Sequence, residues 1–326
     1  MAQNTLTPQV AQIKGQRRFD LKHRFQWVYI LTRHPQARIG LIIMLLMILM
    51  AIFAPFLAPG GKPKYVALPN LPPSAKHILG VDPLGRDEFA LVVYGARISL
   101  EIGFGTGVLA LLVATIIGMT AGYFGGAVDN ILTLIINLFL VIPGLPMLIL
   151  FAAYMKQSTT TVVLTLAFTG WAFHARIIRA QTLSLREKDY VSAAVVAGES
   201  NFTIIFRQIL PNMINIIVGG IIGSSIYGIA ASTALAFLGL TNMEDISWGT
   251  NLFWAQNGNS LLQGAWWVFI PSGLLVALAA LALTWINYGM DEITNPRLRA
   301  ERSLRKILRG IKIQRTRVTP VQLQEH

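Results

Sequence analysis

The sequence predicts an all-α integral membrane protein with six transmembrane helices, and three observations support this fold class. Hydrophobic residues make up 54% of the 326 residues and charged residues only 13%, which is about half the charged share of a soluble domain. Several stretches are apolar enough to cross a bilayer, which takes about 20 residues. The net charge of +12 lies mainly at the two ends of the chain and in one internal loop. A disordered chain or a soluble nucleic-acid-binding protein would lack this hydrophobicity, and the absence of cysteine excludes a disulfide-stapled fold.

The first three expected spans cover residues 39–58, 99–124 and 129–155. The first is uncharged and ends before a Pro-Gly-Gly sequence. Glu101 lies near the start of the second span and Asp129 opens the third, where each carboxylate is expected to reach lipid headgroups or a helix N-terminus. No acidic residue is expected at the centre of a span, so the chain has no obvious carrier for a coupled ion.

The last three expected spans cover residues 161–183, 212–240 and 265–290. The fourth span acquires basic side chains, from His174 to Arg179, only in its last turns. The fifth follows Pro211. Trp266 and Trp267 open the sixth span, where aromatic side chains typically anchor a helix at the membrane interface.

The distribution of Lys and Arg predicts the orientation of the six spans. Residues 1–38, 176–212 and 290–326 carry seven, five and nine of these residues, against six on the opposite face. Cytoplasmic segments carry the excess of Lys and Arg, so both termini are predicted to be cytoplasmic. The chain is thus divided into a basic tail at 1–38, a transmembrane domain at 39–290 and a basic tail at 291–326.

The N-terminal tail carries an amphipathic pattern directly before the first span. Leu21, Phe25, Val28 and Leu31 are at helical spacing among basic residues, which is typical of a helix lying in the cytoplasmic membrane interface. A disordered basic tail attracted to anionic lipid is the alternative interpretation. In both cases membrane lipid is an expected partner.

Glycines inside the apolar spans are expected to serve packing. Gly118 with Gly122, and Gly219 with Gly223, form GxxxG pairs that let helices approach closely. The glycines at 103–107 resemble a dinucleotide-binding fingerprint, but no strand precedes them and they lie within a span, so this match is rejected.

Catalytic and nucleotide-binding motifs are absent from the sequence. There is no H-E-x-x-H metal-binding pattern and no G-x-x-x-x-G-K-[ST] phosphate loop. The chain is therefore not expected to be an enzyme, and any energy for uphill transport must come from another chain.

The cytoplasmic loop at 186–211 carries the most informative pattern. Tyr190, Ala193, Ala194 and Ala197 follow helical spacing and are expected to form one face of small residues, suited to a groove on a partner. Gly198 permits a turn. Ser200 is expected to cap a second short helix, and Pro211 to begin the fifth span.

Ala193-Ala194-x3-Gly198 followed by Leu210-Pro211 resembles the EAA loop of ABC importer permeases. Further motifs narrow the resemblance to the C-type permease subunit of the dipeptide/oligopeptide/nickel family. These motifs are His77-Ile-Leu-Gly-Val-Asp-Pro-Leu-Gly-Arg-Asp87, Tyr94-Gly-Ala-Arg-Ile-Ser-Leu100, Phe237-Leu-Gly-Leu240, Ser247-Trp-Gly249 and Asn295-Pro-Arg-Leu298. The resemblance covers residues 35–300. Ser192 departs from it, because the family has a glutamate there.

This resemblance implies a type I ABC importer permease fold in the plasma (inner) membrane of a prokaryote. The implied partners are a paralogous B-type permease, two ABC ATPase subunits and an extracytoplasmic substrate-binding protein. ATP and Mg would bind to the ATPases, so no cofactor or metal is expected in this chain. Dipeptides or oligopeptides are the implied substrates, and relatives that carry oligosaccharides, nickel or glutathione leave those substrates open.

The same resemblance assigns two sets of candidate residues. The residues expected to couple to the ATPases are Tyr190, Ala193, Ala194, Gly198 and Glu199. Those expected to meet the external binding protein are Asp82, Arg86, Asp87, Trp254 and Asn257. For residues 82–87 a local turn network is an equal alternative. An autonomous secondary transporter is the competing function, and it would require the mid-span carboxylate that the sequence lacks.

Overall fold

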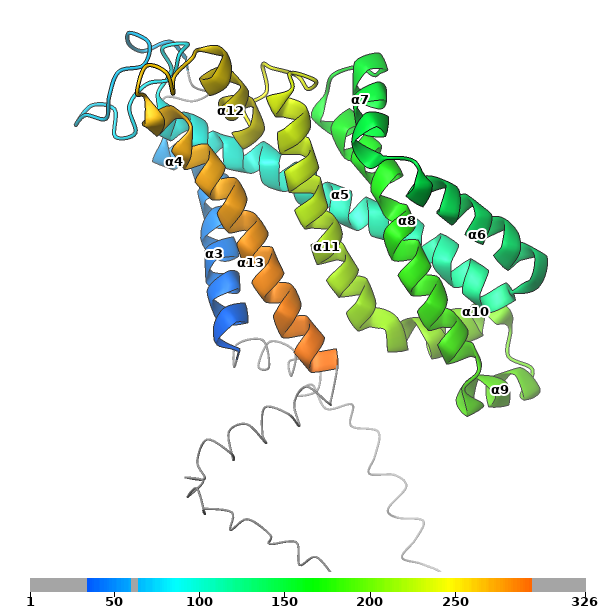
Figure 1. The fold of residues 1–326 in the computed structure, drawn as a ribbon. Helices are drawn as coiled ribbons and strands as arrows, with labels where there is room; N and C mark the ends of the chain where they lie inside the picture. The colour runs from blue at the N-terminus through cyan, green and yellow to red at the C-terminus, as the bar shows by residue number, and fades with distance from the viewer. Residues whose placement is uncertain (1–33, 60–63, 295–326) are drawn as a thin grey trace, which may run out of the picture.

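The computed structural model describes residues 34–59 and 64–294. It confirms an all-α fold with five helices long and apolar enough to cross a membrane, and a sixth span if one bent helix pair is counted as a unit. The expected interfacial helix before the first span and the basic tail beyond residue 294 lie outside the described residues. Figure 1 shows the helices side by side in one bundle.

The first two spans differ in length from their expected ranges. Helix α3 covers Pro35–Ile52 and is followed by the short α4, Ala54–Leu57. Helix α5 covers Glu88–Phe124 and therefore begins well before the expected start at 99. Asp87 is the reason, because its carboxylate accepts a hydrogen bond from the Ala90 amide and caps the helix. At 37 residues, α5 is about 55 Å long and exceeds the thickness of the hydrocarbon core.

The expected third span is not one straight helix. It consists of α6, Gly126–Val141, and α7, Gly144–Tyr154, which meet at an angle of 87°. The break falls at Ile142, whose backbone is extended (φ −69°, ψ 126°). A residue before proline is pushed out of the helical region, and Pro143 follows directly.

Helix α8 covers Thr159–Arg186 and is capped at its start by the Ser158 hydroxyl, which accepts from the Thr161 amide at 3.2 Å. After a two-residue connection, the short α9 covers Asp189–Val196. The expected fourth span at 161–183 lies inside α8.

The segment after α9 corrects the expected role of Pro211. Helix α10, Asn201–Thr203, the π-helical turn Ile204–Ile209 and α11, Leu210–Phe237, form one continuous helix. Pro211 therefore lies within the fifth span instead of beginning it. A proline removes one backbone donor and displaces the carbonyl four residues earlier, and the π turn before Pro211 accommodates this change. Ser200 caps α10, as predicted.

The last segment of the fold consists of α12, Trp248–Asn257, the 3₁₀ turn Trp266–Val268 and α13, Ile270–Thr294. Ser247 and Thr250 form a reciprocal capping box at the start of α12. The sixth expected span begins at the 3₁₀ turn.

Helix α5 runs obliquely through the bundle and packs against α8 and α11 (Figure 1). A Cβ atom on Gly118 would lie 2.6 Å from the Ala175 carbonyl oxygen, and one on Gly122 would lie 2.8 Å from that of Arg179. This GxxxG pair therefore brings α5 and α8 together, as predicted. The rejected fingerprint glycines serve packing too, because a Cβ on Gly107 would lie 2.7 Å from the Ile221 carbonyl oxygen of α11.

The bundle has two distinct ends. Figure 1 shows the start of α3, the end of α13 and α9 at one end, which we call the α9 end. Helices α4, α7 and α12 lie at the opposite end, which we call the α12 end. The three basic regions of the sequence thus adjoin the same end of the molecule.

Candidate functional site

Helix α9 is the main projection at the α9 end, and its inner face is fixed to the bundle. Val191 is almost fully buried and Ala194 is only 6% exposed. Both belong to the hydrophobic cluster that contains Ile204, Ile209 and Met213. Ala194 therefore points into the protein, which corrects the expectation that it shares one outward face with Tyr190 and Ala193.

A Schellman motif ends α9 at the predicted glycine turn. The Glu199 amide donates to the Ala194 carbonyl at 3.1 Å and the Gly198 amide donates to the Val195 carbonyl at 3.0 Å. Gly198 has φ +78°, a conformation that residues with a Cβ atom rarely adopt. A Cβ atom there would have nothing within 4 Å, so the backbone conformation, and not crowding, calls for glycine.

Apolar side chains are exposed both on the outer face of α9 and at the start of the next helix. Tyr190, Val195 and Val196 are exposed on α9, and Phe202 and Phe206 are exposed beyond the turn. The two phenylalanine rings lie with their centroids 4.3 Å apart. We call these five residues the α9 surface. Sequence reasoning identified Tyr190 and missed the other four, although Phe202 and Phe206 are one helical turn apart.

Two hydrogen bonds connect the segments on either side of α9 to the long helix α5. The Tyr123 hydroxyl donates to the Asn201 side-chain oxygen at 2.9 Å. The Arg186 guanidinium donates to the Tyr123 carbonyl at 3.1 Å. The two bonds therefore connect α10 and the end of α8 to the last turns of α5.

A cavity of about 700 Å³ opens between α6, α8, α11 and α13. It is lined by side chains with hydrogen-bonding groups, namely Thr169, His174, Asn215, Ser224, Tyr227 and Asn287, among apolar residues. Gly219 and Gly223 also line it. The second expected GxxxG pair therefore borders a cavity and does not bring two backbones together.

The candidate residues at 82–87 form a local turn network at the α12 end. The Asp82 carboxylate accepts from the Leu84 and Arg86 amides and pairs with the Arg86 guanidinium at 2.7 Å. Asp87 caps α5 and lies 2.7 Å from His77 Nδ1. Asp82 is buried, at 1% exposed. The local turn network, which was the alternative to a contact with the binding protein, is therefore the arrangement that these residues adopt.

The other two external candidates lie on α12. Asn257 is exposed at the end of the helix, and Trp254 is half-buried. Gly258, directly after them, packs against Pro83 of the turn network. The structure therefore brings the two groups of external candidates together.

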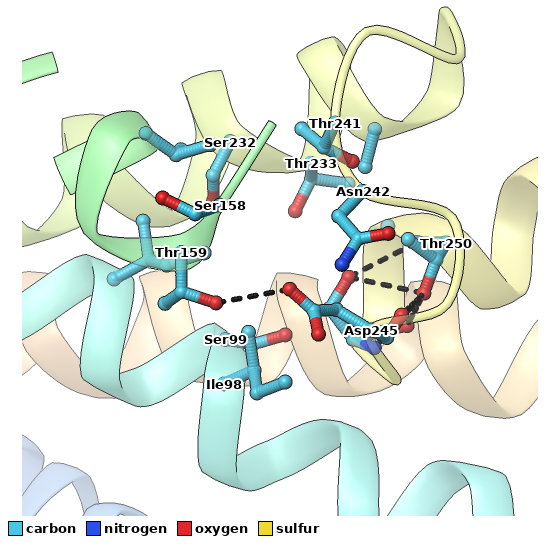
Figure 2. Close-up of a pocket in the computed structure, with 15 residues that line it drawn as sticks. Ile98, Ser99, Ser158, Thr159, Ser232, Thr233, Thr241, Asn242, Asp245 and Thr250 are labelled. Atoms are coloured by element: carbon cyan, nitrogen blue, oxygen red, sulfur yellow. Dashed lines mark hydrogen bonds between the residues drawn. The ribbon is translucent and has the colours of Figure 1, made fainter. Parts of the chain in front are cut away.

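Figure 2 shows a small hydroxyl-lined pocket that joins the start of α8 to the segment before α12. The Thr159 hydroxyl donates to the Asp245 carboxylate across it at 3.2 Å. The pocket volume is about 20 Å³, which is room for about one water molecule. The pocket lies at a contact between α8 and the segment before α12, and it is too small for a substrate.

Asp129 has a protein partner that its sequence position did not reveal. Its carboxylate pairs with the Arg179 guanidinium, with one N–O distance of 2.7 Å, and accepts from the Thr133 hydroxyl at 3.0 Å. Asp129 lies in the first turn of α6, which confirms the expected position at a helix N-terminus, and the pairing with Arg179 is the contact that the sequence did not reveal. The ion pair joins α6 to α8 near the α9 end.

Comparison with known proteins places this architecture in a family. Residues 114–300 match the model of the binding-protein-dependent transport system inner membrane component. Residues 26–73 match that of the N-terminal transmembrane domain of oligopeptide transport permease C.

Curated proteins resemble the chain over most of its length. A putative peptide transport system permease of Brucella abortus is 34% identical over 274 residues, covering 83% of this chain and 91% of that protein. The dipeptide transport system permease DppC of Bacillus subtilis is 35% identical and covers 82% and 84%. The oligopeptide permease OppC of the same organism is 34% identical and covers 81% and 86%. The chain therefore belongs to the family of inner membrane permeases of binding-protein-dependent ABC transport systems, in the OppC/DppC-like branch.

Proposed function

We propose that this chain is one of two permease subunits of an ATP-driven importer for dipeptides or oligopeptides. The names of its relatives support peptides as the substrate. A paralogous permease would form the other half of the pathway. An extracytoplasmic binding protein would deliver the peptide, and two ATPases would bind ATP and Mg and supply the energy.

The observation that carries the proposal is the α9 surface. Exposed apolar side chains on α9 and at the start of the next helix are candidates for an interaction site, and Val196 is 89% exposed. A short helix with such a face suits a groove on a partner. The proposed partner is an ATPase, with Tyr190, Ala193, Gly198 and Glu199 at or beside the contact and Ala194 supporting it from within.

The basic regions that adjoin the α9 end support its placement in the cytoplasm. The α12 end would then face the binding protein. Trp254 and Asn257 are the proposed contacts, and Asp82, Arg86 and Asp87 would act by holding the adjoining turn in shape.

Gly198→Trp tests the coupling role. The substitution forces a side chain into a left-handed conformation, at a cost of about 1–2 kcal/mol, and places a bulky ring beside the α9 surface. We expect peptide uptake by the reconstituted importer to fall at least about tenfold, because a docking contact worth 1.4 kcal/mol changes binding tenfold. ATPase activity stimulated by the loaded binding protein should fall with it.

Gly264→Trp is the matched control, because Gly264 has φ +75° and nothing within 4 Å of a Cβ atom, but it precedes α13 at the α12 end. It imposes the same backbone strain away from the ATPases and should retain coupling. Equal loss in both variants would show general destabilisation, and normal coupling in Gly198→Trp would contradict the proposed docking site. Peptide transport by this chain alone, driven by an ion gradient without ATP, would favour the secondary transporter.

A further inference from the structure

A cavity of about 310 Å³ lies at the α12 end, between the end of α4, the first turn of α5 and the loop before α5. Residues 60–63 lie outside the described part of the chain, and the cavity is defined without them. Its apolar lining draws on all three elements and includes Leu57, Val66, Ile78 and Phe89. Its charged side chains are Lys64, Lys76 and Asp87. The cavity therefore combines an apolar wall with two ammonium groups and one carboxylate.

The two lysines of this cavity are available to an anion. Both are exposed, and neither forms an ion pair with any residue that the structure describes. The Asp87 carboxylate is already engaged, because one oxygen accepts from the Ala90 amide at 3.0 Å and the other lies 2.7 Å from His77 Nδ1. The face opposite the basic regions carries only six Lys and Arg, so two of them in one cavity concentrate its positive charge.

The cavity lies at the level of the membrane interface. Helix α3 has 18 residues and is about 27 Å long, which nearly spans a hydrocarbon core of about 30 Å, and α4 follows it. The loop also packs against Trp267, because a Cβ atom on Gly80 would lie 2.6 Å from the indole Cδ1. Trp267 and the half-exposed Trp266 open the sixth span, where tryptophans typically lie among lipid headgroups. Both observations place the cavity at headgroup depth.

The rim of the cavity is apolar and exposed. Phe56, beside it on α4, is 81% exposed, and the lining residues Leu57 and Ile78 are 47% and 65% exposed. Apolar side chains at this depth are buried at the boundary between headgroups and acyl chains. A ligand for this place therefore needs an anionic group for the lysines and an apolar part for the rim. A free anion lacks the second, and a lipid without net charge lacks the first.

We propose that this cavity binds the headgroup of an anionic phospholipid through Lys64 and Lys76. The acyl chains would lie against Phe56, Leu57 and Ile78. Clustered basic side chains at the membrane surface recognise anionic headgroups by charge. The cavity volume is at the lower end of the range of about 300–1,000 Å³ for ligand sites, which suits a headgroup whose chains remain outside. The bound lipid would contact α4, the loop and α5, and so hold the end of the first span against the start of the long helix.

Native mass spectrometry of the complete importer, purified with its partner subunits, tests the site because it resolves each bound lipid. The probe is phosphatidylglycerol, and phosphatidylcholine with the same chains is the zwitterionic comparison. Lys64→Gln and Lys76→Gln should each lower the affinity for phosphatidylglycerol at one site about fivefold. This change corresponds to the roughly 1 kcal/mol that a lysine contributes near an anionic lipid surface. The double variant should lose most of the preference for phosphatidylglycerol over phosphatidylcholine.

Lys156→Gln is the matched control. Lys156 is also exposed, forms no ion pair with a described residue and follows α7 at the α12 end. It borders a cavity of only about 10 Å³, so removing its charge should leave the affinity for phosphatidylglycerol unchanged. Ala90→Phe fills the proposed lipid site without changing its charge, because Ala90 lines the cavity, and it should weaken the lipid as the lysine variants do. The midpoint of thermal unfolding without added lipid shows whether each variant is folded.

Equal affinity for phosphatidylglycerol in the unmodified importer and in the folded double variant would overturn the inference. Equal affinity of the unmodified site for phosphatidylcholine would do the same. Displacement of the lipid by excess inorganic phosphate would also contradict it, because the site would then take a free anion. If the lysine variants weaken capture of the binding protein and leave the lipid affinity unchanged, the cavity belongs to that protein's interface and not to lipid.

Discussion

Single glycines on α5 set the distances between neighbouring helices. A Cβ atom on Gly107 would clash with the Ser225 hydroxyl and lie 2.7 Å from the Ile221 carbonyl oxygen. A backbone atom cannot move aside without moving its helix. On Gly105, by contrast, the nearest atom to a Cβ would be a methyl carbon of Val163 at 3.2 Å, and a side chain can adjust by that amount.

These two glycines give a residue-scale prediction. Gly107→Ala should lower the stability of the assembled importer by about 1–3 kcal/mol, because it overpacks the contact between α5 and α11. Gly105→Ala should change it little, because the small crowding is offset by the roughly 0.5–1 kcal/mol that alanine gains over glycine in a helix. The midpoint of thermal unfolding in detergent measures both, and equal midpoints would contradict this account of α5 packing.

At the scale of elements, α6 is held to α8 by the Asp129–Arg179 ion pair. The two side chains are 15% and 25% exposed, so both are largely removed from water. Arg176 on α8 adds a hydrogen bond to Asn137 two turns further along α6. These polar contacts help to fix the crossing of the two helices.

Removing one partner of the ion pair should destabilise this crossing. Asp129→Asn or Arg179→Gln should each lower the free energy of unfolding by roughly 1–3 kcal/mol, because the remaining partner loses a charged hydrogen bond. Combining Asp129→Arg with Arg179→Asp should restore part of the loss. Glu187→Gln is the control, since Glu187 is 74% exposed in its pair with Arg186 and exposed pairs contribute little. Thermal unfolding curves of the four variants measure these losses. A loss in Glu187→Gln equal to the loss in the two ion-pair variants would refute the argument.

At the scale of the whole molecule, the basic regions of the chain adjoin the α9 end, and the turn network and α12 lie at the other end (Figure 1). The proposed importer requires this asymmetry, because its ATPases and its binding protein would act at opposite ends. The long helix α5 spans the distance between them, with Asp87 at its start and Tyr123 near the Asn201 contact.

Site-directed labelling can test the orientation of the two ends directly, because the chain contains no cysteine. Val196→Cys at the α9 end and Leu262→Cys at the α12 end place single thiols at positions that are 89% and 87% exposed. A membrane-impermeant maleimide should label Leu262→Cys in right-side-out vesicles and Val196→Cys only in inverted vesicles. The reverse pattern would place the α9 surface outside the cell and exclude its docking to an ATPase.

Much of the architecture follows from local sequence. The length of each apolar stretch predicts a span, Gly198 predicts a left-handed turn, and Ser200 predicts a helix cap. All three depend on residues close together in the chain. The sequence also contained the cause of the α6–α7 break at Pro143, but a proline within an apolar stretch is compatible with a tolerated kink as well as a sharp bend.

The sequence by itself determined the fold class, the family and the loop that carries the glycine turn, since periodicity, apolar length and short motifs are local properties. Only the tertiary structure decided that Ala194 faces inward, that Asp129 pairs with Arg179, and that Asn215 and Asn287 line one cavity. These facts depend on how α6, α8, α11 and α13 are rotated and spaced against one another. That arrangement is set by packing between residues distant in the chain, which no local pattern records.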